Sequence, residues 1–71
     1  MEKREYNPTL KDIEIIKQCL IGFDPSDNCS YSIDDDGNIY VKTAIDTWKA
    51  LAGREWLIDI KNKKCKLVSL N

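Results

Sequence analysis

The stretch that decides the fold is residues 29–43, which read CSYSIDDDGNIYVKT. Apolar and polar residues alternate on both sides of an acidic, glycine-containing turn, and this pattern is typical of a β-hairpin. A three-residue loop at positions 35–37 brings the residues of one face into opposed pairs: Ile33 with Ile39, Tyr31 with Val41, and Cys29 with Thr43. A two-residue loop would instead place Asp34 opposite Ile39. The three-residue loop is therefore predicted, with Gly37 in the left-handed conformation that closes such a turn.

A second pair of alternating segments lies nearer the C-terminus, at residues 54–60 and 65–70. A turn around Asn62 and Lys63 gives a core-facing set of opposed pairs: Ile60 with Cys65, Ile58 with Leu67, and Trp56 with Ser69. The other face combines hydrophobic and charged residues: Leu57, Val68 and Leu70 beside Asp59, Lys61, Lys64 and Lys66. Because this face is half apolar, we expect something to cover it.

Two Thr-x-x-Asp sequences indicate the starts of helices, since a threonine and an acid three residues later form a capping box. The starts are Thr9 with Asp12 and Thr43 with Asp46, and the glycines that would stop the helices are Gly22 and Gly53. In the first helix, at about residues 10–21, the predicted core stripe is Leu10, Ile13, Ile16 and Leu20. Ile15 lies outside this stripe, so we expect it to be exposed or to meet something other than the main core of the domain. The predicted stripe of the second helix is Ile45, Trp48, Leu51 and Ala52.

These elements predict a small single α+β domain of residues 1–71 in the order α-β-β-α-β-β, with two β-hairpins forming a sheet packed by two short helices. Residues 1–8 are strongly charged and are expected to form a flexible N-terminal arm apart from Tyr6. The strand order stays open. Parallel pairing of the second and third strands needs a longer crossover than residues 44–53 readily provide, and the alternative is separate hairpins packed by the helices.

The composition narrows the class of protein. The chain has 71 residues, three cysteines, no histidine and a formal net charge of −1. A domain of this size buries only about 60% of its unfolded surface, so its stability should be marginal. The cysteines form no C-x-x-C pair and, without histidine, complete no zinc site, so a reduced cytoplasmic location is expected. No apolar signal segment or membrane-spanning run is present, so no membrane partner is expected.

The sequence patterns of common enzymes are missing. Without histidine, the Cys/His and Ser/His pairs of nucleophilic catalysis are impossible, and the three glycines are already used by turns and helix stops. The acidic run at positions 34–36 is similar to part of a calcium loop. Alignment on Gly37, however, puts Ser32 at the first ligand position and Thr43 at the twelfth, where glutamate is required. We therefore predict a non-enzymatic protein without catalytic residues, metal or cofactor.

The remaining interpretation is a small interaction or regulatory protein that binds a protein partner or itself. Its predicted contact surface combines the half-apolar face of the second hairpin with an aromatic residue and the acidic tip of the first hairpin: Leu57, Val68, Leu70, Tyr40, Asp34, Asp35 and Asp36. An open sheet edge would also suit the addition of a partner strand. One form of this hypothesis is an inhibitor that mimics nucleic acid, of the kind that phages and mobile elements carry.

The alternative function is nucleic-acid binding through the basic second hairpin. The candidate residues for this function are Arg54, Lys61, Lys63, Lys64 and Lys66. Such binding requires an exposed aromatic side chain on the same face and weakens steeply with salt. Lysines are also common at hairpins because they protect edge strands against aggregation, so protein binding is the preferred hypothesis.

Overall fold

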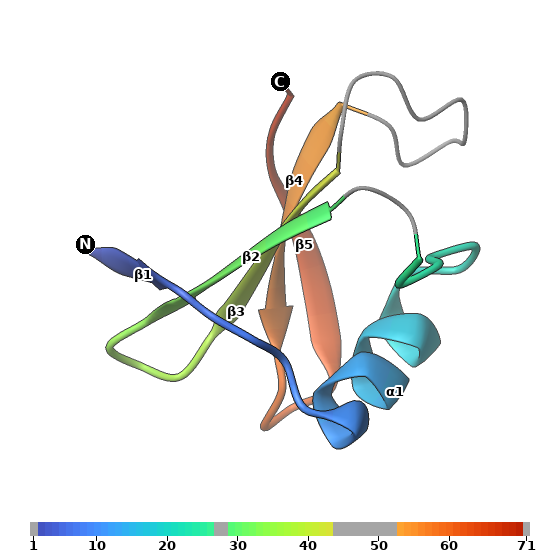
Figure 1. The fold of residues 1–71 in the computed structure, drawn as a ribbon, viewed down its shortest axis with the longest axis horizontal. Coiled ribbons are helices and arrows are strands. Elements are labelled where there is room, and N and C mark those ends of the chain that lie inside the picture. Colours follow the sequence, from blue (N-terminus) through green and yellow to red (C-terminus); the bar gives the residue numbers. More distant parts are fainter. Residues whose placement is uncertain (1, 27–28, 44–52, 71) are drawn as a thin grey trace.

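A computed structural model describes residues 2–26, 29–43 and 53–70 of the chain. In chain order the elements are β1 (Lys3–Glu5), α1 (Leu10–Cys19), β2 (Cys29–Asp34), β3 (Ile39–Thr43), β4 (Arg54–Asp59) and β5 (Lys64–Leu70). The strands form one antiparallel sheet in the order β1-β2-β3-β4-β5, so each strand lies beside its neighbour in sequence. Figure 1 shows the twisted sheet and α1 beside it.

The predicted order α-β-β-α-β-β is wrong. The described residues form a five-stranded antiparallel sheet with a single helix, and the second predicted helix lies outside them. The chain also begins with a strand, β1, within the residues that we expected to form an arm. Its sequence, Lys-Arg-Glu, has no apolar alternation that would predict a strand. The three residues are exposed, and pairing with β2 holds them at the sheet edge.

The predicted first hairpin is confirmed. Strands β2 and β3 pair in the expected register, with Cys29 opposite Thr43, Tyr31 opposite Val41, and Ile33 opposite Ile39. The Gly37 N–H donates to the Asp34 carbonyl at 3.1 Å, and the Asp34 N–H donates to the Asn38 carbonyl at 3.1 Å. Gly37 has a φ of 84°, a conformation that glycine adopts without a Cβ clash.

The predicted register of the second hairpin is wrong by two residues. Cys65 lies opposite Ile58 rather than Ile60, and Leu67 lies opposite Trp56. The turn begins earlier than expected because the Asp59 carboxylate accepts from the backbone N–H of Asn62 at 3.1 Å and from its side-chain amide at 2.8 Å. Beyond Trp56 the pairing shifts at a β-bulge, and Glu55 lies opposite Ser69.

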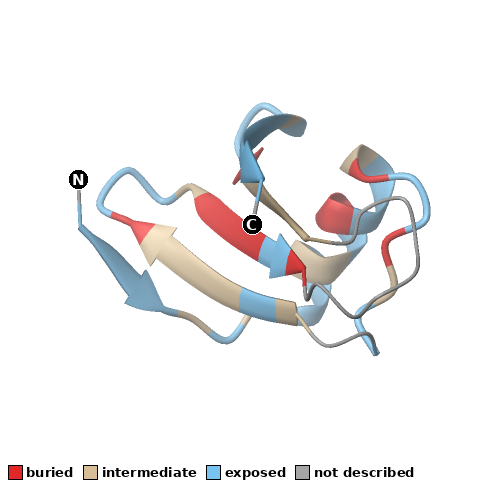
Figure 2. Ribbon diagram, turned by 90° about the horizontal axis from the view of Figure 1, so that it is seen from above, coloured by how far each residue is buried: buried red, intermediate tan, exposed pale blue. Residues whose placement is uncertain are grey.

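Strand β3 joins the two hairpins into one sheet. Its outer neighbour β4 pairs with it antiparallel, with Ile39 opposite Ile58 and Val41 opposite Trp56. The second and third strands of the prediction, which correspond to β3 and β4, are therefore antiparallel neighbours. They are not parallel neighbours, and the two hairpins are not separate. Because β3 is central, four of its five residues are buried, and the outer strands β1 and β5 are mostly exposed (Figure 2).

Helix α1 covers one face of the sheet. Its capping box is confirmed: Thr9 Oγ1 accepts from the Asp12 N–H at 3.1 Å, and the Thr9 N–H donates to the Asp12 carboxylate at 3.0 Å. The buried face of the helix differs from the predicted stripe. Ile15 is buried with Ile16 and Leu20, whereas Leu10 is 86% exposed. The contacting face is therefore turned toward Ile15, and Leu10, at the first helical position, lies outside it.

The core lies between α1 and the central strands. It is built from residues of α1, of the following turn, and of β3 and β4: Ile15, Ile16, Leu20, Phe23, Ile39, Val41 and Ile58. Trp56, Ile60 and Cys65 pack against this core while remaining half-buried. Within the described residues, the sheet face opposite α1 and the outer edge of β5 are therefore not covered by the helix or by another strand.

Candidate functional site: the β5 edge and the face opposite α1

Strand β5 forms one edge of the sheet. Among the residues that the structure describes, it pairs only with β4, and six of its seven residues are exposed. Three large hydrophobic side chains on it face solvent: Leu67 is 43% exposed, Val68 45% and Leu70 70%. Because proteins usually shorten, charge or cover such an edge, an exposed apolar edge strand of this length is a surface suited to binding.

The backbone of Leu67 points away from the sheet. The Arg54 N–H points toward β3, because it donates to Thr43 Oγ1 at 3.1 Å. Hydrogen-bonding direction alternates along a strand, so Leu57 points toward β5 and its partner Lys66 points back toward β4. The next residue, Leu67, therefore directs its N–H and carbonyl outward, where a further strand can pair with them.

The predicted contact surface is only partly assembled at this edge. Val68 and Leu70 lie on it, and Leu57 is half-buried on β4, opposite Lys66. Leu67 was assigned to the core face by the sequence pattern, but the structure leaves it exposed beside Val68. The sequence pattern did not predict this exposure, because alternation does not show that β5 is an edge strand.

Tyr40 and Asp34 are buried and bonded to each other, so they are not available on the surface. The Tyr40 hydroxyl donates to Asp34 Oδ2 at 2.9 Å, while Asp34 Oδ1 accepts from the N–H groups of Asp36 at 2.9 Å and Asn38 at 3.0 Å. Burial alone would raise the pKa of Asp34, but these donors outweigh it and hold the pKa below its usual value. The pKa of Tyr40 is raised, first by its hydrogen bond to the Asp34 carboxylate and then by burial.

Lys3 extends this polar cluster across the sheet face opposite α1. Its ammonium lies 4.5 Å from the centroid of the Tyr40 ring and 3.0 Å from Glu55 Oε2. The other oxygen of Glu55 accepts from the Ser69 hydroxyl at 3.3 Å. These contacts link residues of β1, β3, β4 and β5 on this face. Lys3 was not predicted to take part, because its strand carries no apolar pattern.

The acidic tip is reduced to Asp35 and Asp36, which are exposed. Arg4 lies against one of them, with Nη1 3.0 Å from Asp35 Oδ1. This exposed ion pair contributes little to stability. Two exposed carboxylates, one already paired, are a small surface for phosphate mimicry.

The predicted nucleic-acid residues lie around the β4–β5 turn and along β5. All four lysines, Lys61, Lys63, Lys64 and Lys66, are exposed, and Arg54 is half-buried at the other end of β4. The structure thus separates Arg54 from the lysine cluster by the length of the strand. Every aromatic side chain in the described ranges is buried or half-buried, so the exposed stacking partner that we expected for nucleic acid is missing from them.

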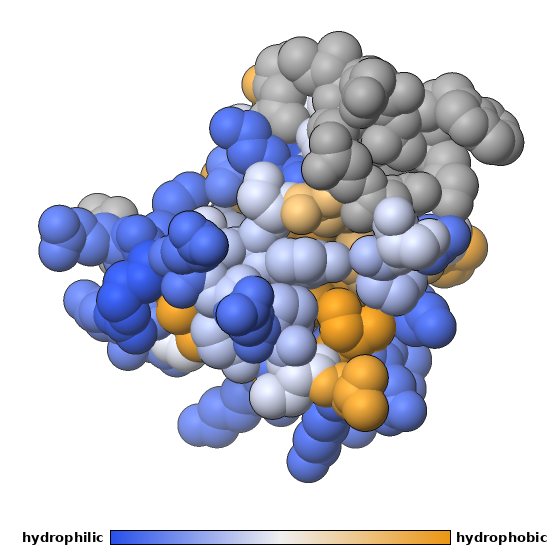
Figure 3. All heavy atoms as spheres, in the orientation of Figure 1, coloured by the Kyte–Doolittle hydropathy of each residue, from blue (hydrophilic) through white to orange (hydrophobic). Residues whose placement is uncertain are grey.

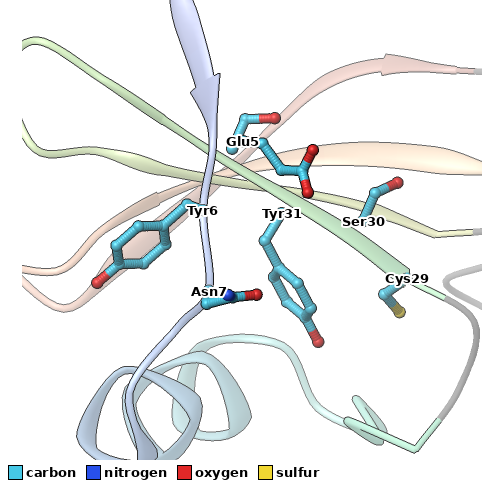
Figure 4. A pocket seen from close by; sticks show the side chains of 7 residues that line it. Glu5, Tyr6, Asn7, Cys29, Ser30 and Tyr31 are labelled. Carbon is cyan, nitrogen blue, oxygen red and sulfur yellow. The ribbon is translucent and has the colours of Figure 1, made fainter.

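An open cleft of about 500 Å³ lies where the chain leaves β1 and diverges from β2. Its lining residues are Glu5, Tyr6, Asn7, Cys29, Ser30, Tyr31 and Ser32. Figure 4 shows that Tyr6 and Tyr31 point in different directions, and that Glu5 and Ser30 point away from the Tyr31 hydroxyl. The polar groups do not converge on one point, in contrast to the arrangement of a small-molecule or catalytic site.

The described residues contain neither a metal-binding cluster nor a membrane-spanning helix. Their His, Cys, Asp and Glu side chains form no group of three that would hold a metal ion. Helix α1, which these residues form, is not long and apolar enough to cross a membrane. Figure 3 shows hydrophobic side chains reaching the surface over α1, and mainly hydrophilic ones over β1 and the β2–β3 turn.

Comparison with protein-family models, with characterised proteins and with solved structures gives no match. No relative therefore indicates a function, and only the chemistry of the surfaces bears on it. Of these, the β5 edge combines exposed apolar side chains, outward backbone groups and nearby lysines in one place.

Proposed function

We propose that this protein is a non-enzymatic binding module that adds an extended segment of a protein partner to the outer edge of β5. The observation that carries the proposal is the edge strand Lys64–Leu70, with Leu67, Val68 and Leu70 exposed and the Leu67 backbone directed outward. In this mode of recognition, main-chain hydrogen bonds supply affinity and side chains on alternate positions supply specificity.

The charges on this edge favour an acidic partner. Lys64 and Lys66 lie on β5, and Lys61 and Lys63 lie in the preceding turn, all exposed. An added strand with acidic side chains near these lysines and apolar ones near Leu67 and Val68 would complement both features. The same lysines discourage pairing of two β5 strands through their basic ends, since like charges directly opposite one another destabilise a strand pair.

The test uses a short blocked peptide of alternating glutamate and valine, with an alternating lysine and valine peptide as the charge control. We expect the acidic peptide to shift the backbone amide NMR signals of β5 and to slow hydrogen exchange at Leu67. The variant Leu67→Pro removes the outward N–H, and an edge strand accepts proline at such a position. Binding should weaken by about tenfold or more, equivalent to about 1.4 kcal/mol.

Leu10→Pro is the matched control, because Leu10 is also an exposed leucine and stands at the first helical position, where proline is tolerated. This variant should bind as the unchanged protein does. Leu70→Glu, which leaves the strand backbone intact, provides a second measurement if Leu67→Pro fails to fold. Equal losses in the Leu67 and Leu10 variants would refute β5 as the binding edge, and binding of both peptides with equal affinity would refute the preference for an acidic partner.

The second candidate, nucleic-acid binding, is favoured by the four exposed lysines near one end of the β4–β5 hairpin. It predicts that a mixed pool of short single-stranded nucleic acids shifts the amide signals of Lys61, Lys63 and Lys64, with affinity falling steeply as salt rises. Binding that resists salt and requires Leu67 would exclude it as the main function. Light scattering on the protein alone distinguishes both from self-association.

A further inference from the structure

Cys19 and Cys65 meet where the C-terminal end of α1 lies against β5. The Cys65 thiol donates to the Cys19 carbonyl oxygen at 3.2 Å, although the two residues are 46 positions apart in the sequence. Both are half-buried, and neither is in a disulfide. The sequence pattern contained no hint of this pair, because nothing in the spacing of the cysteines indicates which elements pack together.

We infer that Cys19 and Cys65 form a disulfide when the protein meets a low-molecular-weight disulfide such as oxidised glutathione. Carbonyl and Cα–C bonds are about 1.2 and 1.5 Å long, so Cys65 Sγ lies within about 6 Å of the Cys19 Cα. Disulfides join residues whose Cα atoms are typically about 4.4–6.8 Å apart. The Cys65 sulfur already lies against the Cys19 backbone, so forming the bond requires the Cys19 side chain to rotate toward it and α1 and β5 to reach this Cα separation.

The third cysteine is poorly placed for the same reaction with Cys65. Cys29 lies on β2, which is separated from β5 by two intervening strands, a distance of about 14 Å across a flat sheet. It is also displaced along the strands. Cys29 lies opposite Thr43, at the end of β3 where Arg54 begins β4, whereas Cys65 lies opposite Ile58.

The reaction proceeds by two thiol–disulfide exchanges. The thiolate of one cysteine attacks a sulfur of oxidised glutathione, which forms a mixed disulfide and releases one glutathione thiolate. The thiolate of the other cysteine attacks the protein sulfur of that mixed disulfide, forms the Cys19–Cys65 bond and releases the second glutathione thiolate. The protein loses two protons and two electrons, and oxidised glutathione becomes two reduced molecules.

The new bond would join the end of α1 to the edge strand β5. It would close a long loop of the chain, which reduces the entropy of the unfolded state and stabilises the folded one. We expect the midpoint of thermal unfolding to rise by at least about 10 °C on oxidation. Burial, and then the neighbouring Cys65, raise the pKa of the Cys19 thiol.

The experiment treats the folded protein with oxidised glutathione, blocks remaining thiols and maps the products by mass spectrometry. The expected product has lost two hydrogens and contains linked peptides carrying Cys19 and Cys65. Cys19→Ser and Cys65→Ser each abolish this product, whereas the matched variant Cys29→Ser retains it. Circular dichroism confirms that each variant is folded, and the unchanged chain is also oxidised in concentrated guanidinium chloride, where the preference for this pair should disappear.

A stable glutathione adduct without the cross-link would overturn the inference. Cross-links that include Cys29 in comparable yield, or a preference for Cys19 and Cys65 that persists in guanidinium chloride, would do so as well. A rise in the unfolding midpoint that survives in Cys29→Ser, and is reversed by a dithiol reductant, would support it.

Discussion

Removing the Tyr40 hydroxyl tests the polar cluster that supports the sheet face opposite α1. In Tyr40→Phe the ring stays in place against the Lys3 ammonium, but Asp34 loses the donor at 2.9 Å. A hydrogen bond to a charged group contributes about 1.5–3 kcal/mol, so we expect a loss of about 2 kcal/mol in the free energy of unfolding. A 71-residue domain has a total stability of about 4–10 kcal/mol, so the loss is a substantial fraction of it.

The effect of Tyr40→Phe should depend on pH with a definite sign. The pKa of Asp34 is lowered in the folded state, so its stabilisation is present above its unfolded pKa of about 4 and is lost as pH falls through the folded value. The pKa of Tyr40 is raised, so its contribution is present below about 10 and is lost as pH rises through the folded value. The difference between the two proteins should therefore be largest at neutral pH and smaller at both extremes.

The assay is urea unfolding at several pH values, followed by far-ultraviolet circular dichroism. Tyr31→Phe is the matched control, because Tyr31 is a half-buried tyrosine of the adjacent strand whose hydroxyl makes no hydrogen bond to the described residues. It should cost about 0.5 kcal/mol or less. Equal losses in the two variants, or a Tyr40→Phe loss that is unchanged in acid, would refute the role assigned to the hydrogen bond with Asp34.

Two further predictions concern packing and the first hairpin. Ile16→Ala should destabilise the protein by about 2–5 kcal/mol, because Ile16 is fully buried between α1 and the sheet. Leu10→Ala on the same helix should be nearly neutral, because Leu10 is exposed. Thermal unfolding distinguishes the two variants, and similar shifts in their unfolding midpoints would contradict the observed helix orientation. Gly37→Ala should cost about 1 kcal/mol, because a Cβ at Gly37 meets no atom within 4 Å but the φ of 84° is unfavourable for alanine. Gly37→Asn should recover part of this loss in chemical denaturation, since asparagine tolerates that conformation better.

Local patterns predicted the first hairpin because every cue in it agrees. The alternation of Ile33, Ile39 and Val41 sets which side faces the core, and Gly37 permits the turn that gives this register. The capping box at Thr9 was predictable for the same reason, since both partners lie within one turn of helix. Contacts between residues close in sequence are therefore well represented in the sequence pattern.

Features that depend on distant contacts were not predictable in this way. Strand β1 is defined by its pairing with β2 across the intervening helix, and its own residues have no apolar signal. The predicted buried face of α1 was wrong because several apolar stripes fit one helix. Contact with Val41 and Ile58 selects the stripe through Ile15 and Ile16. The proposed edge was foreseen only in part, since the exposure of Leu67 follows from the position of β5 in the sheet.

The register error in the second hairpin shows what hydrophobic alternation can decide. A shift of one residue moves every side chain to the other face, but a shift of two preserves both faces, so the pairs Cys65–Ile58 and Cys65–Ile60 satisfy the pattern equally well. The turn makes the choice: the Asp59 carboxylate binds Asn62, and Lys63 adopts a positive φ of 55°. These local polar contacts place Leu67 opposite Trp56 and so help to determine which residues β5 presents at the edge proposed to bind a partner.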